Sequence, residues 1–307
     1  MDMIAFVFPG QGVQKPRMGE ELLTYPVVSR CFEEAADALG YDVSVLCHEE
    51  GAEKLAETRW VQPGLFTLET AIARLVMAET DIKPAMAAGL SLGEYAALTI
   101  AGAFDFAEAV KLVALRGELM EQAGKGKGTM AAVMGLDRDT MEQAVESGRQ
   151  AGPVWVCNVN APAQLVISGS FEGGEAASAA AKELGARRVK ALTVAGPFHT
   201  PYLQEAADGL YDALTRADIN PCAIPVYANV TGKPHGNADA IRRTLADHVT
   251  HPVLWMDCVK AMAAAGCTRY YEMGPGKTVS GLIKKIIQGA DTRVVNDAAS
   301  YGKVVEE

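Results

Sequence analysis

Five residues, Gly-Leu-Ser-Leu-Gly at positions 89–93, constrain the fold more than any other stretch of the chain. A short apolar run, Ala85–Ala88, precedes them, and the Ala- and Leu-rich segment Glu94–Ile100 that follows favours a helix. A strand, a sharp turn and a helix form the setting in which a serine hydroxyl is exposed above a sheet, since flanking glycines let the turn tighten. The helix start supplies free N–H groups and a positive dipole end, which favour an oxyanion. Ser91 is therefore a candidate nucleophile; the plainer interpretation is a helix-capping serine in a glycine-lined turn.

The bulk composition limits the kind of protein that this chain can be. A length of 307 residues with 49% hydrophobic residues suffices for one large domain, or for one that carries a smaller domain. A net charge of −10 argues against nucleic-acid binding, and charged residues interrupt every apolar run before it reaches membrane-spanning length. The six scattered cysteines form no Cys-x-x-Cys pair, which argues against a metal site and a disulfide scaffold. With no basic leader at the N-terminus, we expect a cytoplasmic protein.

A second, smaller unit is predicted after the flexible basic joint at residues 124–128. Strand and helix patterns follow there in the order βαββαβ, which is the ferredoxin-like arrangement. The predicted fold is α/β: an α/β-hydrolase-like large domain of residues 1–125 and 196–300, an inserted ferredoxin-like small domain of residues 126–195, and a frayed tail of residues 301–307. The six elements of the small domain are expected at Thr129–Met134, Arg138–Ser147, Val154–Val159, Gln164–Ser168, Phe171–Leu184 and Arg188–Val194.

An arginine lies on the buried face of a predicted helix over Phe106–Gln122. The apolar stripe of this helix contains Leu112, Val113 and Met120, and Arg116 occupies the position between them that faces inward. A guanidinium on a buried face is unfavourable unless an anion meets it. Arg116 therefore forms an internal salt bridge, extends its head to solvent, or waits for a carboxylate on a ligand, which its planar fork holds bidentately.

The histidine of most interest is His199, in Phe198-His199-Thr200-Pro201, where the chain returns to the larger domain. Thr200 is expected to cap the next helix, with Pro201 as its first residue. His199 is then a loop residue at the junction of two domains, where clefts form. His48 and His235 have polar neighbours and are predicted to lie on the surface. Because no histidine follows position 251, the order of the α/β-hydrolase triad, with its histidine near the chain end, is not followed.

Taken together, these motifs resemble the malonyl-CoA:acyl-carrier-protein transacylases. The resemblance extends over about residues 4–290, in the order and approximate spacing of that family. No single motif carries it. The stretches that do so are Phe8–Gly12, Gln62-Pro63, residues 89–94, Arg116, Gly196–His199 and Gly274–Gly276.

The resemblance implies a role for each of these positions. Ser91 would be the nucleophile and His199 its general base and acid. The main-chain carbonyl of His248 would orient the histidine, at a position where family members usually carry glutamine. The resemblance further implies an oxyanion hole from the backbone N–H groups of Gln11 and Leu92, a clamp for the malonyl carboxylate at Arg116, and a pocket that includes Phe198, Leu90, Gln62 and Asn160. Leu90 departs from the family, which usually has histidine beside the serine, and Phe198 is expected to crowd an α-methyl branch, which disfavours methylmalonyl groups.

The implied activity is transfer of malonyl from malonyl-CoA to the phosphopantetheine thiol of acyl carrier protein, for fatty-acid synthesis. It needs no permanently bound cofactor and no metal, and its partners are coenzyme A and the carrier, with neither nucleic acid nor membrane. The alternatives are a free-standing polyketide acyltransferase, a serine thioesterase or hydrolase, and a carrier-binding scaffold without activity. Because carrier proteins are acidic, docking needs a local basic patch, for which the candidates are Lys125, Lys127, Arg187, Arg188, Lys190, Lys284 and Lys285.

Overall fold

The centre of the molecule is a five-stranded parallel sheet. The computed structural model describes residues 3–306, and the strands of this sheet follow the order β7-β2-β1-β8-β9. The middle strand is entirely apolar from Ala5 to Phe8 and fully buried, as expected of a parallel strand covered on both faces. Phe8 pairs with Gly89, so the loops that follow β1 and β2 leave the sheet side by side. The strands are β1 (Ile4–Phe8), β2 (Met86–Gly89), β7 (Val226–Tyr227), β8 (Arg269–Met273) and β9 (Asp291–Val295).

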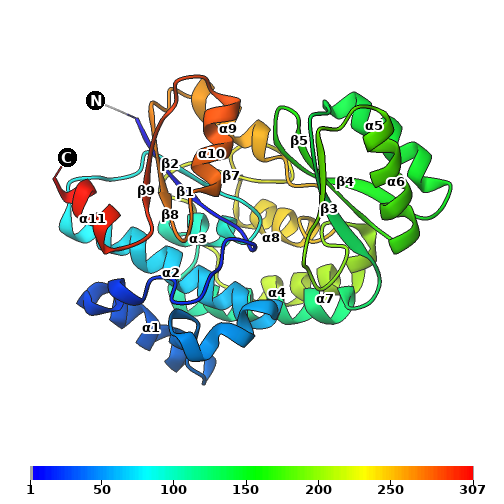
Figure 1. Ribbon diagram of the computed structural model, residues 1–307. Helices are drawn as coiled ribbons and strands as arrows, with labels where there is room; N and C mark the ends of the chain where they lie inside the picture. The colour runs from blue at the N-terminus through cyan, green and yellow to red at the C-terminus, as the bar shows by residue number, and fades with distance from the viewer. Residues whose placement is uncertain (1–2, 307) are drawn as a thin grey trace.

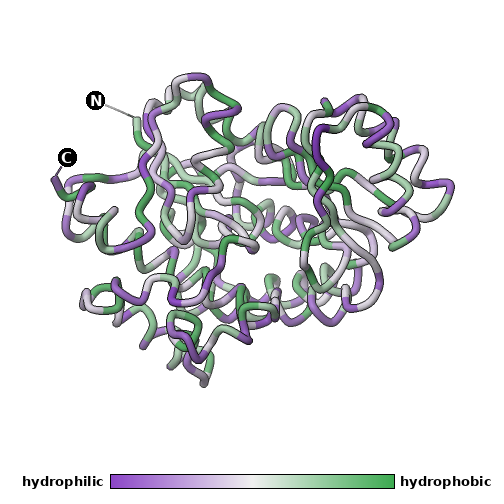
Figure 2. The backbone as a smooth tube through the Cα atoms, viewed as in Figure 1, coloured by the Kyte–Doolittle hydropathy of each residue, from purple (hydrophilic) through white to green (hydrophobic). Residues whose placement is uncertain are grey.

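Helices cover both faces of this sheet (Figure 1). Successive side chains of a strand point to opposite faces, so Phe6 and Phe8 belong to one hydrophobic core with α1–α4, whereas Ala5 and Val7 pack with α9 and α10 on the other face. Figure 2 shows hydrophilic and hydrophobic segments alternating along the covering helices, as expected where only one side is buried. The helices are α1 (Pro26–Leu39), α2 (Thr58–Glu79), α3 (Gly93–Ile100), α4 (Phe106–Gly124), α7 (Gln204–Arg216), α8 (Ala238–Asp247), α9 (Trp255–Ala264), α10 (Thr278–Ile286) and α11 (Ala298–Val305).

A separate four-stranded antiparallel sheet lies beside this body, drawn in green in Figure 1. Its strands follow the order β4-β5-β3-β6 and its two helices enclose a hydrophobic core of their own. An isolated bridge between Asn158 and Val253 joins it to the larger body. The elements occur in the order expected from the sequence: β3 (Thr129–Met134), α5 (Arg138–Arg149), β4 (Val154–Ala161), β5 (Gln164–Gly169), α6 (Phe171–Glu183) and β6 (Arg188–Ala191).

One local prediction is wrong, and another is correct only in part. Residues 301–306 are not a frayed tail, because α11 begins at Ala298 and buries Tyr301 and Val304. Asp297 caps this helix by accepting from the Ser300 N–H, a short signal that the charged chain end obscured. Glu307 lies outside the described residues.

The second prediction concerns Thr200. It occupies the N-cap position before Pro201, as expected, but the element that begins there is a short 3₁₀ turn, Pro201–Leu203, and α7 begins only at Gln204. The Thr200 hydroxyl donates to the Pro197 carbonyl at 2.6 Å, so it stabilises the loop that carries His199 instead of capping a helix. None of the helices in residues 3–306 is long and apolar enough to cross a membrane.

Candidate active site

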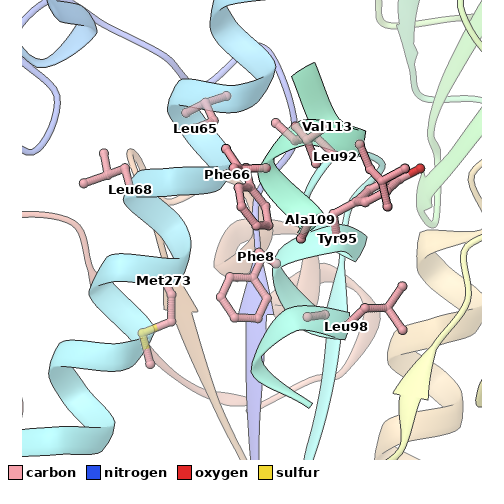
Figure 3. Packing of buried hydrophobic residues seen from close by; sticks show 14 of the residues in the cluster. Phe8, Leu65, Phe66, Leu68, Leu92, Tyr95, Leu98, Ala109, Val113 and Met273 are labelled. Atoms are coloured by element: carbon pink, nitrogen blue, oxygen red, sulfur yellow. The ribbon is translucent and has the colours of Figure 1, made fainter. Parts of the chain in front are cut away.

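The glycine-flanked serine sits on a sharp turn between β2 and α3. Ser91 has φ +54°, a left-handed conformation that costs energy for a residue with a side chain. The flanking glycines are required by packing, because a Cβ at Gly89 would lie 1.8 Å from the carbonyl carbon of Gly93, and one at Gly93 would lie 2.5 Å from the Phe8 oxygen. Figure 3 shows Leu92 and Tyr95, just after the serine, among the buried residues of the large hydrophobic core. The turn is thus held rigidly, with the Ser91 hydroxyl facing the cleft.

The serine and the loop histidine meet although they are 108 residues apart. The Ser91 Oγ lies 2.9 Å from His199 Nε2. On the other side of the ring, Nδ1 lies 2.7 Å from the His248 carbonyl oxygen. Because a carbonyl only accepts, Nδ1 carries the proton and Nε2 is left to accept from the serine. The hydrogen bonds therefore select the tautomer that a general base needs.

The surroundings of His199 keep it neutral. Burial lowers its pKa to about 4, and the nearby positive charge of Arg116 acts in the same direction, against the opposing effect of the His248 carbonyl. The His248 side chain is itself fully buried, with its ring 5.0 Å from that of His199. Near neutral pH, His199 is a free base.

Arg116 lies beside the serine with only 1% of its surface exposed. One terminal nitrogen donates to Gln62 Oε1 at 2.8 Å and the other to Ser91 Oγ at 3.1 Å, while Nε has no partner. No carboxylate of the described residues forms an ion pair with this guanidinium, so the internal salt bridge considered above is wrong, and burial rules out a head extended into solvent. Burial lowers the pKa of Arg116. A buried cation with unused donors is able to bind an anion.

Two residues with free backbone N–H groups, Gln11 and Leu92, line the same cleft as Ser91. The loop after β1 packs tightly on the serine turn: Leu90 N donates to the Phe8 carbonyl at 2.9 Å, and a Cβ at Gly10 would lie 2.4 Å from the Leu90 oxygen. Within residues 3–306, the N–H groups of Gln11 and Leu92 have no hydrogen-bond acceptor. The Gln11 side chain is anchored away from the serine, on Thr58 Oγ1 at 3.2 Å. Both amides are free to donate to an oxyanion.

These groups line a cleft of about 210 Å³ between the two sheets. Residues from both bodies contribute, including Met130 and Val166 from the smaller one and Leu282 from the larger one. Asn160 also lines the cleft, and its side-chain oxygen lacks a partner. Of the residues expected at the site, only His248 lies outside the cleft, behind His199. The expected residues that line it are Gln11, Gln62, Leu90, Ser91, Leu92, Arg116, Asn160, Phe198 and His199.

Three polar residues behind the serine were not expected at the site. Asn229 bonds to the serine turn, and Glu94 and His235 lie beyond it. The prediction that His235 lies on the surface is wrong, since its side chain is fully buried with Nε2 2.8 Å from Glu94 Oε1; His48, with 41% of its side chain exposed, does lie there. The signals were faint: a glutamate directly after the glycine-serine motif, and an asparagine at the end of a strand.

A serine hydrogen-bonded to a neutral histidine, in a cleft with free N–H groups on an α/β fold, is typical of serine acyltransferases and hydrolases. Residues 5–302 match the family model described as an acyl transferase domain. The chain belongs to this acyl transferase family.

Relatives of known name are similar to this chain over its full length. The chain is 41% identical over 308 residues to the malonyl CoA-acyl carrier protein transacylase of Escherichia coli K12, with 100% of each chain covered. An acyl carrier protein S-malonyltransferase from Vibrio cholerae superposes with a TM-score of 0.94 at 40% identity, covering 98% of this chain and 99% of that one. A malonyl-transacylase solved in complex with a type II PKS acyl-carrier protein superposes with a TM-score of 0.95 at 38% identity, covering 99% of both chains.

Proposed function

We propose that the protein transfers the malonyl group of malonyl-CoA to the phosphopantetheine thiol of acyl carrier protein, through a malonyl ester on Ser91, and so supplies fatty-acid synthesis. The observation that carries this proposal is the buried Arg116 guanidinium, which has no carboxylate partner and lies 3.1 Å from Ser91 Oγ. A malonyl group attached to that oxygen carries a free carboxylate within reach of the unused donors. The names of the full-length relatives support the same substrate.

The first half-reaction follows from the hydrogen bonds around Ser91. His199 Nε2 takes the hydroxyl proton as Oγ attacks the thioester carbonyl, and the His248 carbonyl stabilises the resulting imidazolium. The N–H groups of Gln11 and Leu92 hold the tetrahedral oxyanion, each contributing on the order of 3 kcal/mol. The carbon–sulfur bond then breaks, coenzyme A leaves as its thiol with the proton from Nε2, and malonyl-Ser91 remains.

The second half-reaction runs in reverse with a different thiol. His199 takes the proton of the carrier's phosphopantetheine thiol, the sulfur attacks the malonyl ester, and the proton returns to Ser91 Oγ. Both thiols use one site in turn, so the kinetics are ping-pong. The chemistry needs no resident cofactor, and we place it in the cytoplasm, where the six unpaired cysteines stay reduced.

Selectivity rests on charge and on shape. An acetyl group would leave Arg116 desolvated and unpaired, which disfavours it by roughly 1–3 kcal/mol. Phe198, which is buried and lines the cleft, restricts the space for an α-methyl branch. Gln62 orients the guanidinium through its side-chain oxygen, while Leu90 and Asn160 complete the wall beside the substrate.

For carrier docking we favour the basic residues nearest the cleft. Lys285 donates to Gln164 at 2.7 Å, and Gln164 lines the cleft. Arg187 and Lys285 line one shallow hollow, so they form a local positive patch on an otherwise acidic chain.

We also infer the domain division that this cleft requires: an α/β-hydrolase-like body of residues 1–125 and 196–300, extended through α11 because Tyr301 and Val304 pack in its core, with the ferredoxin-like unit of residues 126–195 inserted. The separate hydrophobic cores and the sheet order β4-β5-β3-β6 support it. The cleft then lies at a domain junction, where ligand sites commonly form.

One experiment tests the function directly. The protein is incubated with malonyl-, methylmalonyl- or acetyl-CoA and its intact mass is measured, with Ser91→Ala as control. We expect a malonyl adduct on the parent protein alone, and weaker or no adduct with the other two thioesters. A folded protein that forms no adduct contradicts the proposal. Rapid release of free malonate without a thiol acceptor also contradicts it, and indicates a hydrolase instead.

A second candidate is the same reaction for a polyketide pathway. It is favoured by the likeness to a malonyl-transacylase bound to a type II PKS carrier protein. Competition between fatty-acid and polyketide carrier proteins for the malonyl-enzyme separates the two, because the preferred carrier discharges it faster.

A further inference from the structure

A chain of buried polar groups lies behind the serine, on the side away from the cleft. It starts at the end of β7, which pairs with β2 at Ala87–Val226 and Ala88–Tyr227. Because neighbouring parallel strands end at the same edge of a sheet, the residues after β7 lie beside the serine turn. Asn229, Glu94 and the side chain of His235 are all buried there.

Asn229 clamps the serine turn at two points. Its side-chain oxygen accepts the Ser91 N–H at 2.7 Å, and its side-chain nitrogen donates to the Gly89 carbonyl at 2.7 Å. These bonds close the ends of a turn whose central residue has the unfavourable φ of +54°. The amide therefore stabilises the strained conformation that directs Oγ toward His199.

Glu94 holds Asn229 in turn. It lies in the first turn of α3 and its carboxylate accepts the Asn229 backbone N–H at 2.9 Å. The other carboxylate oxygen lies 2.8 Å from His235 Nε2. Since a carboxylate only accepts, that nitrogen carries a proton and donates. A fully buried carboxylate is stable only when such donors surround it.

His235 reaches Glu94 because the chain after β7 folds back on itself. Ala228 N donates to the Lys233 carbonyl and His235 N to the Val226 carbonyl, and Gly232 has φ +66°. The second ring nitrogen of His235 lies 3.1 Å from Thr244 Oγ1 of α8. The ring thus connects Glu94 to a helix of the large body.

We propose that Glu94 and His235 are positioning residues: together they hold Asn229, which fixes the Ser91 turn for acylation. None of them touches the cleft. This inference rests on the proposed role of Ser91 as nucleophile and adds a second set of residues on which its reactivity depends. It predicts loss of acylation rate with little change in substrate affinity, since Arg116 and Gln62 stay in place.

The test compares Glu94→Ala with the isosteric Glu94→Gln. Single-turnover formation of the malonyl adduct is followed by rapid quenching and intact mass, below the melting temperature of each variant. Glu94→Ala should lower the maximal acylation rate about 100-fold, the effect of a small misplacement of a reacting group. The half-saturating malonyl-CoA concentration should stay within about twofold, because the acyl contacts are unchanged.

Glu94→Gln should recover most of the lost rate. Its side-chain oxygen still accepts the Asn229 N–H, and its amide donates to His235 Nε2 once the ring adopts its other tautomer. His235→Ala should resemble Glu94→Ala, with His235→Gln intermediate. His48→Gln is the matched control: this histidine also pairs with a glutamate, Glu20, but on the surface.

The outcomes separate this inference from the proposed function. If the parent protein forms no adduct, the proposed function fails. If the parent does and folded Glu94→Ala and His235→Ala acylate at the parental rate, only the positioning role fails. A rise in the half-saturating concentration at an unchanged maximal rate also contradicts it. If Glu94→Ala does not fold, His235→Ala and His235→Gln test the inference by the same two measurements, the maximal acylation rate and the half-saturating malonyl-CoA concentration.

Discussion

Two buried charges lie on opposite sides of Ser91 and are treated in opposite ways. Behind the serine, Glu94 is fully buried, and its carboxylate receives a backbone N–H and an imidazole N–H. On the cleft side, Arg116 is equally buried but donates only to Gln62 and Ser91, and its Nε has no partner.

The difference indicates what each charge is for. A buried charge whose partners all come from the protein belongs to the framework, since burial without partners costs several kcal/mol. A buried charge beside a cavity that lacks some of its hydrogen-bond partners remains unfavourable until a ligand supplies them. This contrast supports both proposals: that the satisfied glutamate positions the serine, and that the unsatisfied arginine selects the substrate.

The serine between the two charges has the largest expected effect. Ser91→Ala should lower malonyl transfer by about 10⁴-fold or more, because the residue that forms the acyl intermediate is lost. Transfer is measured by the appearance of malonyl-carrier protein. His199→Ala should approach the same loss, since Ser91 then lacks its base. Substantial transfer by a folded Ser91→Ala variant would place the reaction elsewhere and remove the basis of the comparison.

Arg116→Met is the next test and breaks the comparison most directly. It should lower malonyl relative to acetyl transfer by about 5- to 160-fold, the equivalent of roughly 1–3 kcal/mol. The same change should leave the free energy of unfolding unchanged or raise it, because an incompletely paired buried charge is replaced by an apolar side chain.

Glu94→Ala is the opposite test. It should lower the free energy of unfolding, because the Asn229 N–H and the His235 imidazole lose their buried acceptor. The free energies of both variants are measured by urea denaturation at neutral pH. If Arg116→Met destabilises the fold as much as Glu94→Ala does, the two charges are both structural. An unchanged ratio of malonyl to acetyl transfer would contradict the proposal that Arg116 binds the malonyl carboxylate.

The cleft side of the comparison could be predicted from the sequence. Ser91 lies in a motif with its own turn geometry, and Arg116 interrupts an apolar helical stripe, so each leaves a local signal. The convergence of Ser91 with His199 over 108 residues came from the resemblance, since no local pattern encodes it.

The framework side could not be predicted. Glu94 meets Asn229 across 135 residues and His235 across 141, and contacts of that separation depend on strand order. His235 has polar sequence neighbours, which suggested the surface, yet the fold-back after β7 buries its side chain. The last helix was missed for a related reason: Tyr301 and Val304 show their apolar spacing only once the cap at Asp297 is recognised.

The pH dependence of acylation sharpens the comparison further. His199 must be neutral to accept the serine proton, and its pKa is lowered to about 4 by burial first and by the Arg116 charge second. The rate constant for adduct formation should therefore fall only as the pH drops through about 4, well below the ordinary histidine pKa of about 6.5. In Arg116→Met the acid limb should move to higher pH, because a positive charge has been removed.

Single-turnover rates across a pH series measure this shift, with unfolding monitored in parallel. Glu94→Gln should leave the acid limb where it is in the parent, because burial and the Arg116 charge are the causes of the lowered pKa. An acid limb near the ordinary value in the parent would show that His199 is more solvated than its burial indicates.

The smallest expected effect lies far from both charges and separates stability from positioning. Tyr301 is buried in α11 and donates to Glu79 Oε2 at 2.7 Å, with its ring edge-on to Tyr25 at 5.2 Å. Tyr301→Phe removes the hydrogen bond and keeps the ring, so unfolding should become easier by about 1 kcal/mol. Acylation below the melting temperature should stay at the parental rate. If this loss of stability slowed acylation as Glu94→Ala does at equal destabilisation, the slow rate of the Glu94→Ala variant would reflect a weaker fold, and the carboxylate behind the serine would have no specific role in positioning it.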